Sequence, residues 1–409
     1  MPRRMLALIA LSLFLAMTLW FSATAVAPAL VTRFHMTGGE AAWLTMAVQA
    51  GFVAGTLLTA ILNVPDVINA RHLFGVGCLV GAAANAGVAA AGSAESAIAL
   101  RLLTGVALAC VYPPGMKLVA GWFTQRRGTA LGILIGALTI GSAFPHLVAA
   151  VLPDLTWPSL VRLSSALALA GGVIIVTVVR DGPYVAASAP FDARAALHVW
   201  TNRGTRQAIL GYLGHMWELY AVWTWMAAFA SASLTAYAAG HGARTTSAGG
   251  SLAAFVVIAS GAVGAALAGV AADRIGKARV AAWAMLLSAA CALLSCAVFG
   301  ASPTWLYLLA IVWGASVVAD SAQFSALVAE FSPRESVGTA LTLETCAGFL
   351  LTMISIRLTP MVAEAIGWRW AFLLLIPGPL LGAVAVRGLD RRARAAAGAP
   401  GHSFLVPRS

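Results

Sequence analysis

The sequence alternates between long apolar runs and short polar gaps along its whole length. Each run has roughly 20 residues or more, which is the length that a helix needs to cross the hydrocarbon core of a bilayer. The runs are too long for strands of a membrane barrel, so the pattern predicts an all-α membrane protein with twelve transmembrane helices. The runs cover residues 5–32, 41–62, 73–92, 97–123, 128–152, 158–179, 207–231, 248–271, 279–300, 304–328, 337–360 and 370–389.

The longest polar stretch, residues 181–206, separates these runs into two sets of six. We therefore predict two six-helix halves joined by a cytoplasmic linker. The final LVPRS resembles a protease site left by an expression tag, and we place it in a tail outside the fold. The predicted boundaries are 1–180 for the N-terminal half, 181–206 for the linker, 207–394 for the C-terminal half and 395–409 for the tail.

Composition supports a membrane protein and excludes several other classes. Of the 409 residues, 61% are hydrophobic and 10% are charged, too few polar side chains for a soluble enzyme or a disordered chain. The net charge of +11 does not indicate nucleic-acid binding, because the basic residues lie scattered in the gaps between runs. All five cysteines lie inside apolar runs without metal-ligand spacing, so we expect neither a metal nor a cofactor.

The arginines and lysines also predict the orientation. If the N-terminus is cytoplasmic, seventeen of the 25 basic residues lie in cytoplasmic segments, and the outer loops hold only Arg33, Arg244 and Arg369. Such a bias predicts a multi-pass protein of the plasma or inner membrane with both termini in the cytoplasm.

The two halves resemble each other in sequence. Gly128-Thr-Ala-Leu131 begins the fifth run and Gly338-Thr-Ala-Leu341 begins the eleventh, 210 positions later. Trp157 and Trp368 precede the sixth and twelfth runs, 211 positions apart. These offsets predict a duplicated six-helix unit related by a parallel pseudo-two-fold axis, with a solute path between the halves.

The loop after the eighth run carries the most specific motif. Its sequence, Gly269-Val-Ala-Ala-Asp273-Arg274-Ile-Gly276-Lys277-Ala-Arg279, resembles the signature G-x-x-x-D-R-x-G-[RK]-x-R of the major facilitator superfamily of secondary transporters. The corresponding loop of the first half keeps Asp66 and Arg71 but lacks both glycines. The resemblance implies that these residues form a conformational latch, and the alternative is a charged loop that only sets the topology.

A second resemblance lies in the fourth run. Arg101-Leu-Leu-Thr-Gly105 is similar to the fourth-helix pattern of that superfamily, which implies an arginine in or near a central cavity. The general design is similar to that of bacterial small-anion carriers. We therefore expect Arg101 and Lys117 to bind a solute, with Trp20, Tyr220 and Trp223 in the binding wall.

Acidic residues inside the apolar runs are confined to the second half. They are Glu218, Asp320 and Glu344. Such groups are costly in a membrane, so each is a candidate for proton coupling. His215 and Glu218 are three positions apart and share a helix face, which favours proton sharing between them. The alternative is a structural hydrogen-bonded pair that ties two helices together.

These features together favour a secondary active transporter over an enzyme or a channel, because the sequence has no catalytic motif and its loops are short. The leading hypothesis is a proton-coupled symporter of a small anionic solute that works by alternating access. The alternative is a proton-driven efflux pump for hydrophobic or cationic compounds. The expected partners are a solute, protons and the lipid bilayer, with one chain acting as a monomer.

Overall fold

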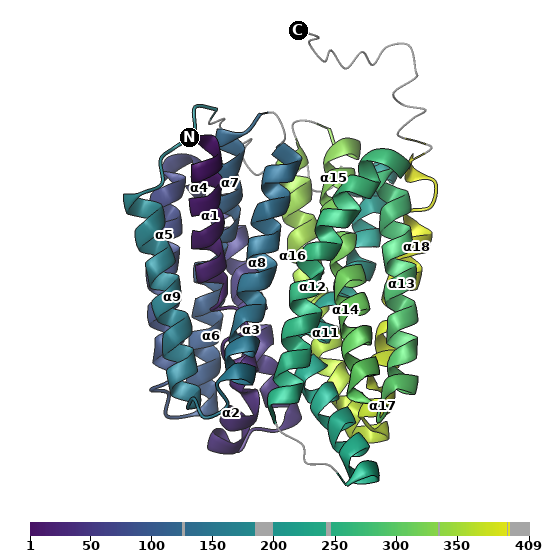
Figure 1. The fold of residues 1–409 in the computed structure, drawn as a ribbon. Coiled ribbons are helices and arrows are strands. Elements are labelled where there is room, and N and C mark those ends of the chain that lie inside the picture. Colours follow the sequence, from purple (N-terminus) through teal and green to yellow (C-terminus); the bar gives the residue numbers. More distant parts are fainter. Residues whose placement is uncertain (125–126, 185–198, 243–246, 334–335, 391, 393–409) are drawn as a thin grey trace.

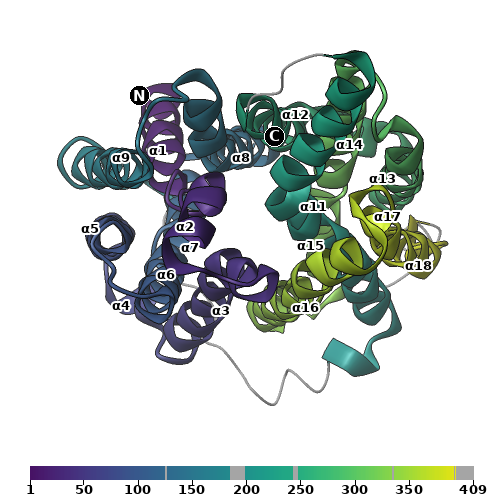
Figure 2. The same cartoon turned by 90° about the horizontal axis from the view of Figure 1, so that it is seen from below.

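The computed structural model describes residues 1–124, 127–184, 199–242, 247–333, 336–390 and 392. These residues form a bundle of long helices without a strand, and the first and second halves of the chain lie side by side (Figures 1 and 2). The first half contains α1 (Pro2–Met17), η1 (Thr24–Val26), α2 (Ala27–Phe34), α3 (Gly38–Ile61), α4 (Val64–Val67), α5 (Ala70–Val88), α6 (Ala94–Ala109), α7 (Tyr112–Trp122), α8 (Arg127–Val151) and α9 (Trp157–Thr177).

The second half is also entirely helical in its described part. Its elements are α11 (Arg203–His241), α12 (Ser247–Ile275), α13 (Lys277–Val298), α14 (Pro303–Ala319), α15 (Ser321–Phe331), α16 (Val337–Ile366), α17 (Trp368–Ala371), η3 (Phe372–Leu375) and α18 (Pro377–Ala385). The linker prediction ended at residue 206, whereas α11 begins at Arg203. The side chain of Asn202 accepts hydrogen bonds from the backbone N–H groups of Gly204 and Thr205 and so caps the helix. Residues 185–198 of the predicted linker and the tail 395–409 lie outside the described part.

Nine helical segments of the described chain are long and apolar enough to cross a membrane. The all-helical fold is therefore confirmed, while the full count of twelve, the two-fold relation and the orientation stay predictions. The first predicted run, 5–32, does not qualify because it is not one helix: α1 ends at Met17 and η1 begins at Thr24.

Breaks interrupt two further predicted helices. The run 97–123 forms α6 and α7, with a break at Cys110 and Val111, and the run 304–328 lies within α14 and α15, with a break at Asp320. Residues 110 and 320 are 210 positions apart, the offset that separates the Gly128 and Gly338 segments. The hydropathy of each run did not reveal these breaks, because it averages over the whole run and so hides single polar positions such as Asp320.

Two helix pairs join the halves: α3 packs on α16, and α8 packs on α12 (Figure 2). At the centre of the first pair, the Thr352 hydroxyl donates to Oε1 of Gln49 at 2.5 Å. At the start of α3, the Arg357 guanidinium fills the space where Gly39 would carry a side chain. The contact between α3 and α16 therefore extends from the middle of α3 to its first residues.

Candidate functional site

A cavity of about 120 Å³ lies between the halves, in the middle of the bundle. Its wall is formed by both halves and is mainly aromatic, with a few hydroxyl side chains. Within the described part of the chain, no charged side chain lines it. The lining residues are Met17, Trp20, Phe52, Tyr112, Ile135, Leu138, Thr139, Tyr212, Met216, Leu219, Tyr220, Trp223, Val318, Ser321, Ser325, Thr345 and Phe349.

The aromatic rings of this wall pack on one another across the boundary between the halves. The Trp20 ring centroid is 5.3 Å from that of Phe52 and 5.8 Å from that of Tyr220, and the Tyr220 centroid is 5.4 Å from that of Trp223. The structure thus places Trp20, Tyr220 and Trp223 in one wall. Their role in binding a solute stays a prediction.

A buried pair of titratable residues lies directly behind this wall. Nδ1 of His215 in α11 is 2.8 Å from Oδ1 of Asp320, the residue at the break between α14 and α15. Both side chains are almost fully buried, and the two atoms are at ion-pair distance without hydrogen-bond geometry. The next residues in the chain, Met216 and Ser321, line the cavity.

The other two acidic candidates are also buried. Oε1 of Glu218 accepts a hydrogen bond of 2.6 Å from the indole of Trp313, and Oε1 of Glu344 has no hydrogen-bond partner among the described residues. The sequence favoured proton sharing between His215 and Glu218, but the structure turns them to different partners. Three positions on a helix differ in direction by about 60°, which is enough to direct His215 to Asp320 at the helix break and Glu218 to Trp313 in α14.

Arg101 is fully buried, and uncharged acceptors from several helices surround it. Its Nη1 donates to the Leu19 carbonyl at 2.9 Å and to Asn85 Oδ1 at 2.9 Å, and its Nη2 donates to the Trp20 carbonyl. Its Nε donates to the Leu44 carbonyl at 3.2 Å. The guanidinium therefore holds the interruption after α1 against α3 and α5, and the carbonyls at a helix C-terminus carry partial negative charge that favours a cation there.

Neither predicted cationic ligand lines the central cavity. Arg101 directs its donors toward the backbone of the first half, and Lys117 in α7 is absent from the wall. The sequence could not show this, because hydropathy places an arginine within a helix without giving the direction of its side chain. Binding of an anion by these two residues stays a prediction.

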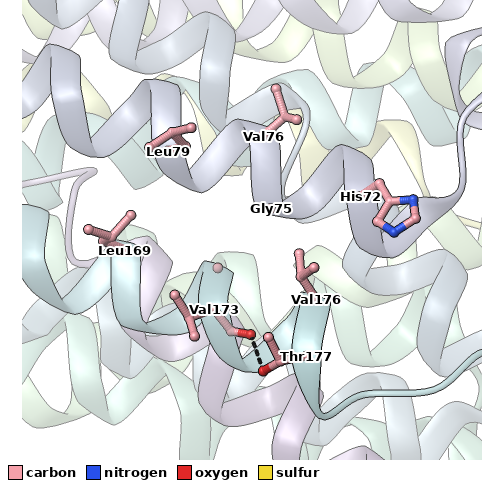
Figure 3. Close-up of a pocket in the computed structure, with 9 residues that line it drawn as sticks. His72, Gly75, Val76, Leu79, Leu169, Val173, Val176 and Thr177 are labelled. Atoms are coloured by element: carbon pink, nitrogen blue, oxygen red, sulfur yellow. Dashed lines mark hydrogen bonds between the residues drawn. The ribbon is translucent and has the colours of Figure 1, made fainter.

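A larger cavity of about 390 Å³ lies between α5 and α9 (Figure 3). Its lining is almost entirely apolar, apart from His72 and Thr177, and the Thr177 hydroxyl donates to the carbonyl of Val173 at 2.7 Å. Only helices of the first half contribute to it, so it lies away from the boundary between the halves.

The second-half latch loop between α12 and α13 is held by two acidic residues that the sequence pattern did not connect with it. Nζ of Lys277 is 2.7 Å from Oε2 of Glu330. The Asp390 carboxylate accepts hydrogen bonds of 3.0 Å from the backbone N–H groups of Ala278 and Arg279. Asp390 thus caps the N-terminus of α13.

The remaining residues of the latch signature, Gly269, Asp273 and Arg274, form no ion pair or capping hydrogen bond with another described residue. Asp273 and Arg274 are exposed. No atom lies within 4 Å of the position where Gly269 would carry a Cβ, so no neighbouring helix packs closely on this glycine. The sequence places Gly269 in the latch, but in this conformation the contacts of the signature lie at Gly276, Lys277 and Arg279.

The first-half loop has a corresponding arrangement. Nε of Arg71 donates to Oδ1 of Asp181 at 3.1 Å, and its Nη2 donates to Oδ2 at 3.0 Å. The side chain of Asp66 lies outside the described part. Asp181 and Asp390 are 209 positions apart, close to the offsets of the other landmarks. A search at that offset would have paired them, because each follows the last helix of its half.

The two glycines of the second-half signature allow a matched test. Gly276 has a φ of 101°, and the Asp390 carboxylate occupies the space where its Cβ would lie. We expect Gly276→Ala to lower the free energy of unfolding by about 1–3 kcal/mol, because alanine is strained at positive φ and would displace the cap. Gly269→Ala is the control and is expected to leave the unfolding midpoint in detergent unchanged. Equal midpoints for both variants would contradict this description of the latch.

Comparison with a family model places this bundle among known proteins. The model "Major Facilitator Superfamily" matches residues 9–257 and 230–407. The chain belongs to the major facilitator superfamily. It is therefore a membrane transporter and not an enzyme, and its bundle is that of a multi-pass protein.

A solved structure supports the same fold. The crystal structure of a point mutant of the nucleoside transporter NupG superposes with a TM-score of 0.71 over 94% of this chain and 99% of that chain. The two sequences are 15% identical. At 15% identity, this likeness shows a shared fold and nothing about the solute.

Proposed function

We propose that this superfamily member is a proton-coupled secondary transporter of a flat, largely hydrophobic solute that is neutral or cationic. One observation carries the proposal. The central cavity is built by both halves, its wall is aromatic, and within the described residues it presents no charged side chain. Alternating access then consists of rocking the halves about this cavity, with both termini in the cytoplasm as the arginine distribution predicts.

The cavity favours this solute class over a small anion. An anion that leaves water needs a cation or several hydrogen-bond donors. Arg101 is already surrounded by carbonyl and amide oxygens, and Lys117 does not line the wall. Aromatic faces instead stack on flat rings and attract cations. The geometry therefore supports the alternative from the sequence, a carrier of hydrophobic or cationic compounds.

The buried acids support proton coupling. A carboxylate within the membrane is costly in its charged form, and uptake of a proton removes that cost. Asp320 precedes Ser321 and Glu344 precedes Thr345, and both of the following residues line the cavity. The protonation state of these acids can therefore influence the wall without direct contact with the solute. We assign the principal proton site to Asp320 with His215, the pair at the helix break.

The likeness to NupG is compatible with this solute class. NupG is a nucleoside transporter, and a nucleoside carries a flat heterocycle. The aromatic wall carries the choice of solute class, and the likeness to NupG adds a nucleoside to the solutes worth testing.

A panel of solutes tests the proposal. We would measure thermal stabilisation and counterflow in proteoliposomes for N-methylquinolinium and adenosine, with nitrate and lactate as the small anions. We expect N-methylquinolinium or adenosine to be transported, and Phe349→Ala to lower the affinity about tenfold because a stacking face is lost. The control is Phe299→Ala, which removes a phenyl ring outside the cavity. Transport of nitrate or lactate alone would contradict the proposal.

A further inference from the structure

Two tryptophans in the cavity wall have indole N–H groups without a hydrogen-bond acceptor. Trp20 lies in the interruption after α1 and Trp223 lies in α11, and their side chains are 2% and 3% exposed. Neither Nε1 atom has a partner among the described residues, and neither is exposed to water. Both indoles pack against the same ring, Tyr220, at centroid distances of 5.8 Å and 5.4 Å.

Four other indole N–H groups of the described chain have an acceptor. Trp122 donates to the carbonyl of Arg180 at 2.8 Å, Trp217 to that of Leu374 at 3.0 Å, and Trp225 to that of Ile356 at 2.9 Å. Trp313 donates to the Glu218 carboxylate. Buried indole N–H groups normally find an acceptor, as these four do. The two tryptophans whose buried N–H groups are unpaired both belong to the residues that line the cavity.

We propose that Trp20 and Trp223 are specificity-determining residues whose indole N–H groups donate to acceptor atoms of the transported solute. This inference rests on the proposed function and narrows its substrate class to flat molecules with at least two hydrogen-bond acceptors, such as ring nitrogens or carbonyl oxygens. An unpaired buried donor is costly, so a solute that supplies an acceptor gains binding free energy that an apolar solute of the same shape does not gain.

The two indole donors lie on opposite halves of the bundle, which matters for transport. Trp20 belongs to the first half and Trp223 to the second, so a solute that accepts from both connects the two halves. A solute with one acceptor can satisfy only one half at a time. We therefore expect solutes with two acceptors to favour the conformation in which the halves are close together around the cavity.

Three bicyclic probes of nearly equal shape separate hydrogen bonding from ring stacking. Naphthalene has no ring nitrogen, quinoline has one and quinoxaline has two. Binding of each probe would be measured by fluorescence titration of the intact protein in one detergent, for the wild type, Trp20→Phe and Trp223→Phe. We expect each variant to lower the affinity for quinoxaline about tenfold relative to its affinity for naphthalene, since one hydrogen bond is lost while a ring remains.

Trp217→Phe is the matched control, because it removes an interior indole whose N–H is already bonded to Leu374. We expect it to leave the ratio of quinoxaline affinity to naphthalene affinity unchanged, even if the protein is less stable. An equal loss for all three probes in Trp20→Phe and Trp223→Phe would overturn this inference and leave the proposed function in place. Failure of the wild type to bind any of the three probes would instead contradict both.

Discussion

Asp320→Asn is expected to abolish accumulation driven by a proton gradient, with a loss of roughly 100-fold in the initial rate, the scale on which a positioned proton-transfer group acts. Asparagine has nearly the same shape as aspartate but does not bind and release a proton. The His215 ring, 2.8 Å away, would then face an uncharged partner at the break between α14 and α15. Solute exchange without a gradient is expected to continue, because Asp320 is not part of the cavity wall.

The measurement is uptake into proteoliposomes with and without an imposed pH gradient, using the solute identified by counterflow. Asp154→Asn is the control, because it also converts an aspartate to an asparagine but at an exposed position between α8 and α9. Substitutions at exposed positions usually have small effects, so we expect Asp154→Asn to transport within about twofold of the wild type. Gradient-driven accumulation by Asp320→Asn at the wild-type rate would exclude Asp320 as the principal proton site.

Arg101→Met is expected to lower the free energy of unfolding by about 3–5 kcal/mol, the largest stability effect of any single substitution that we predict. Methionine fills part of the volume but removes the guanidinium donors from the carbonyls of Leu19, Trp20 and Leu44. The Leu19 carbonyl keeps the hydrogen bond from the Ser22 hydroxyl. Unpaired buried polar groups cost about 1–3 kcal/mol each. The chain around Trp20 would lose its attachment to α3 and α5, so we also expect weaker solute binding.

Arg101→Lys separates the hydrogen-bonding role of the arginine from its charge. Lysine keeps the positive charge but replaces the planar fork with a single ammonium group that cannot reach all the acceptors. If Arg101 acts by holding the interruption after α1, Arg101→Lys is destabilised nearly as much as Arg101→Met in reversible detergent unfolding. Wild-type stability together with selective loss of anion binding in Arg101→Met would instead support the anion-binding role that the fourth-helix resemblance implies.

The sequence predicted the parts of this protein that depend on composition and spacing. Runs of apolar residues predict helices because a membrane leaves no other way to satisfy the backbone, and the signature from Gly269 to Arg279 indicated the superfamily. The same pattern missed the interruption after Met17 and the break at Asp320. Residues 18–23 contain no charged side chain, so their hydropathy does not mark the interruption, and at the second place hydropathy averages over the single charged residue Asp320.

The direction of side chains was harder to predict than their depth in the membrane. Arg101 and Asp320 were both recognised as costly residues within apolar runs, but the sequence did not show that one contacts backbone carbonyls and the other a histidine. The aromatic residues of the cavity also come from separate helices. Trp20 and Phe349 are 329 positions apart, and only the packing of α16 on α3 brings their parts of the chain together.

The most direct test of a proton-coupled carrier for flat solutes is to record proton movement caused by the solute itself. Proteoliposomes containing the wild-type protein and an internal pH-sensitive dye would receive N-methylquinolinium or adenosine on the outside, with no imposed gradient. We predict a change in internal pH that depends on the solute and is absent in Asp320→Asn. Movement of either solute without any change in internal pH would contradict proton coupling.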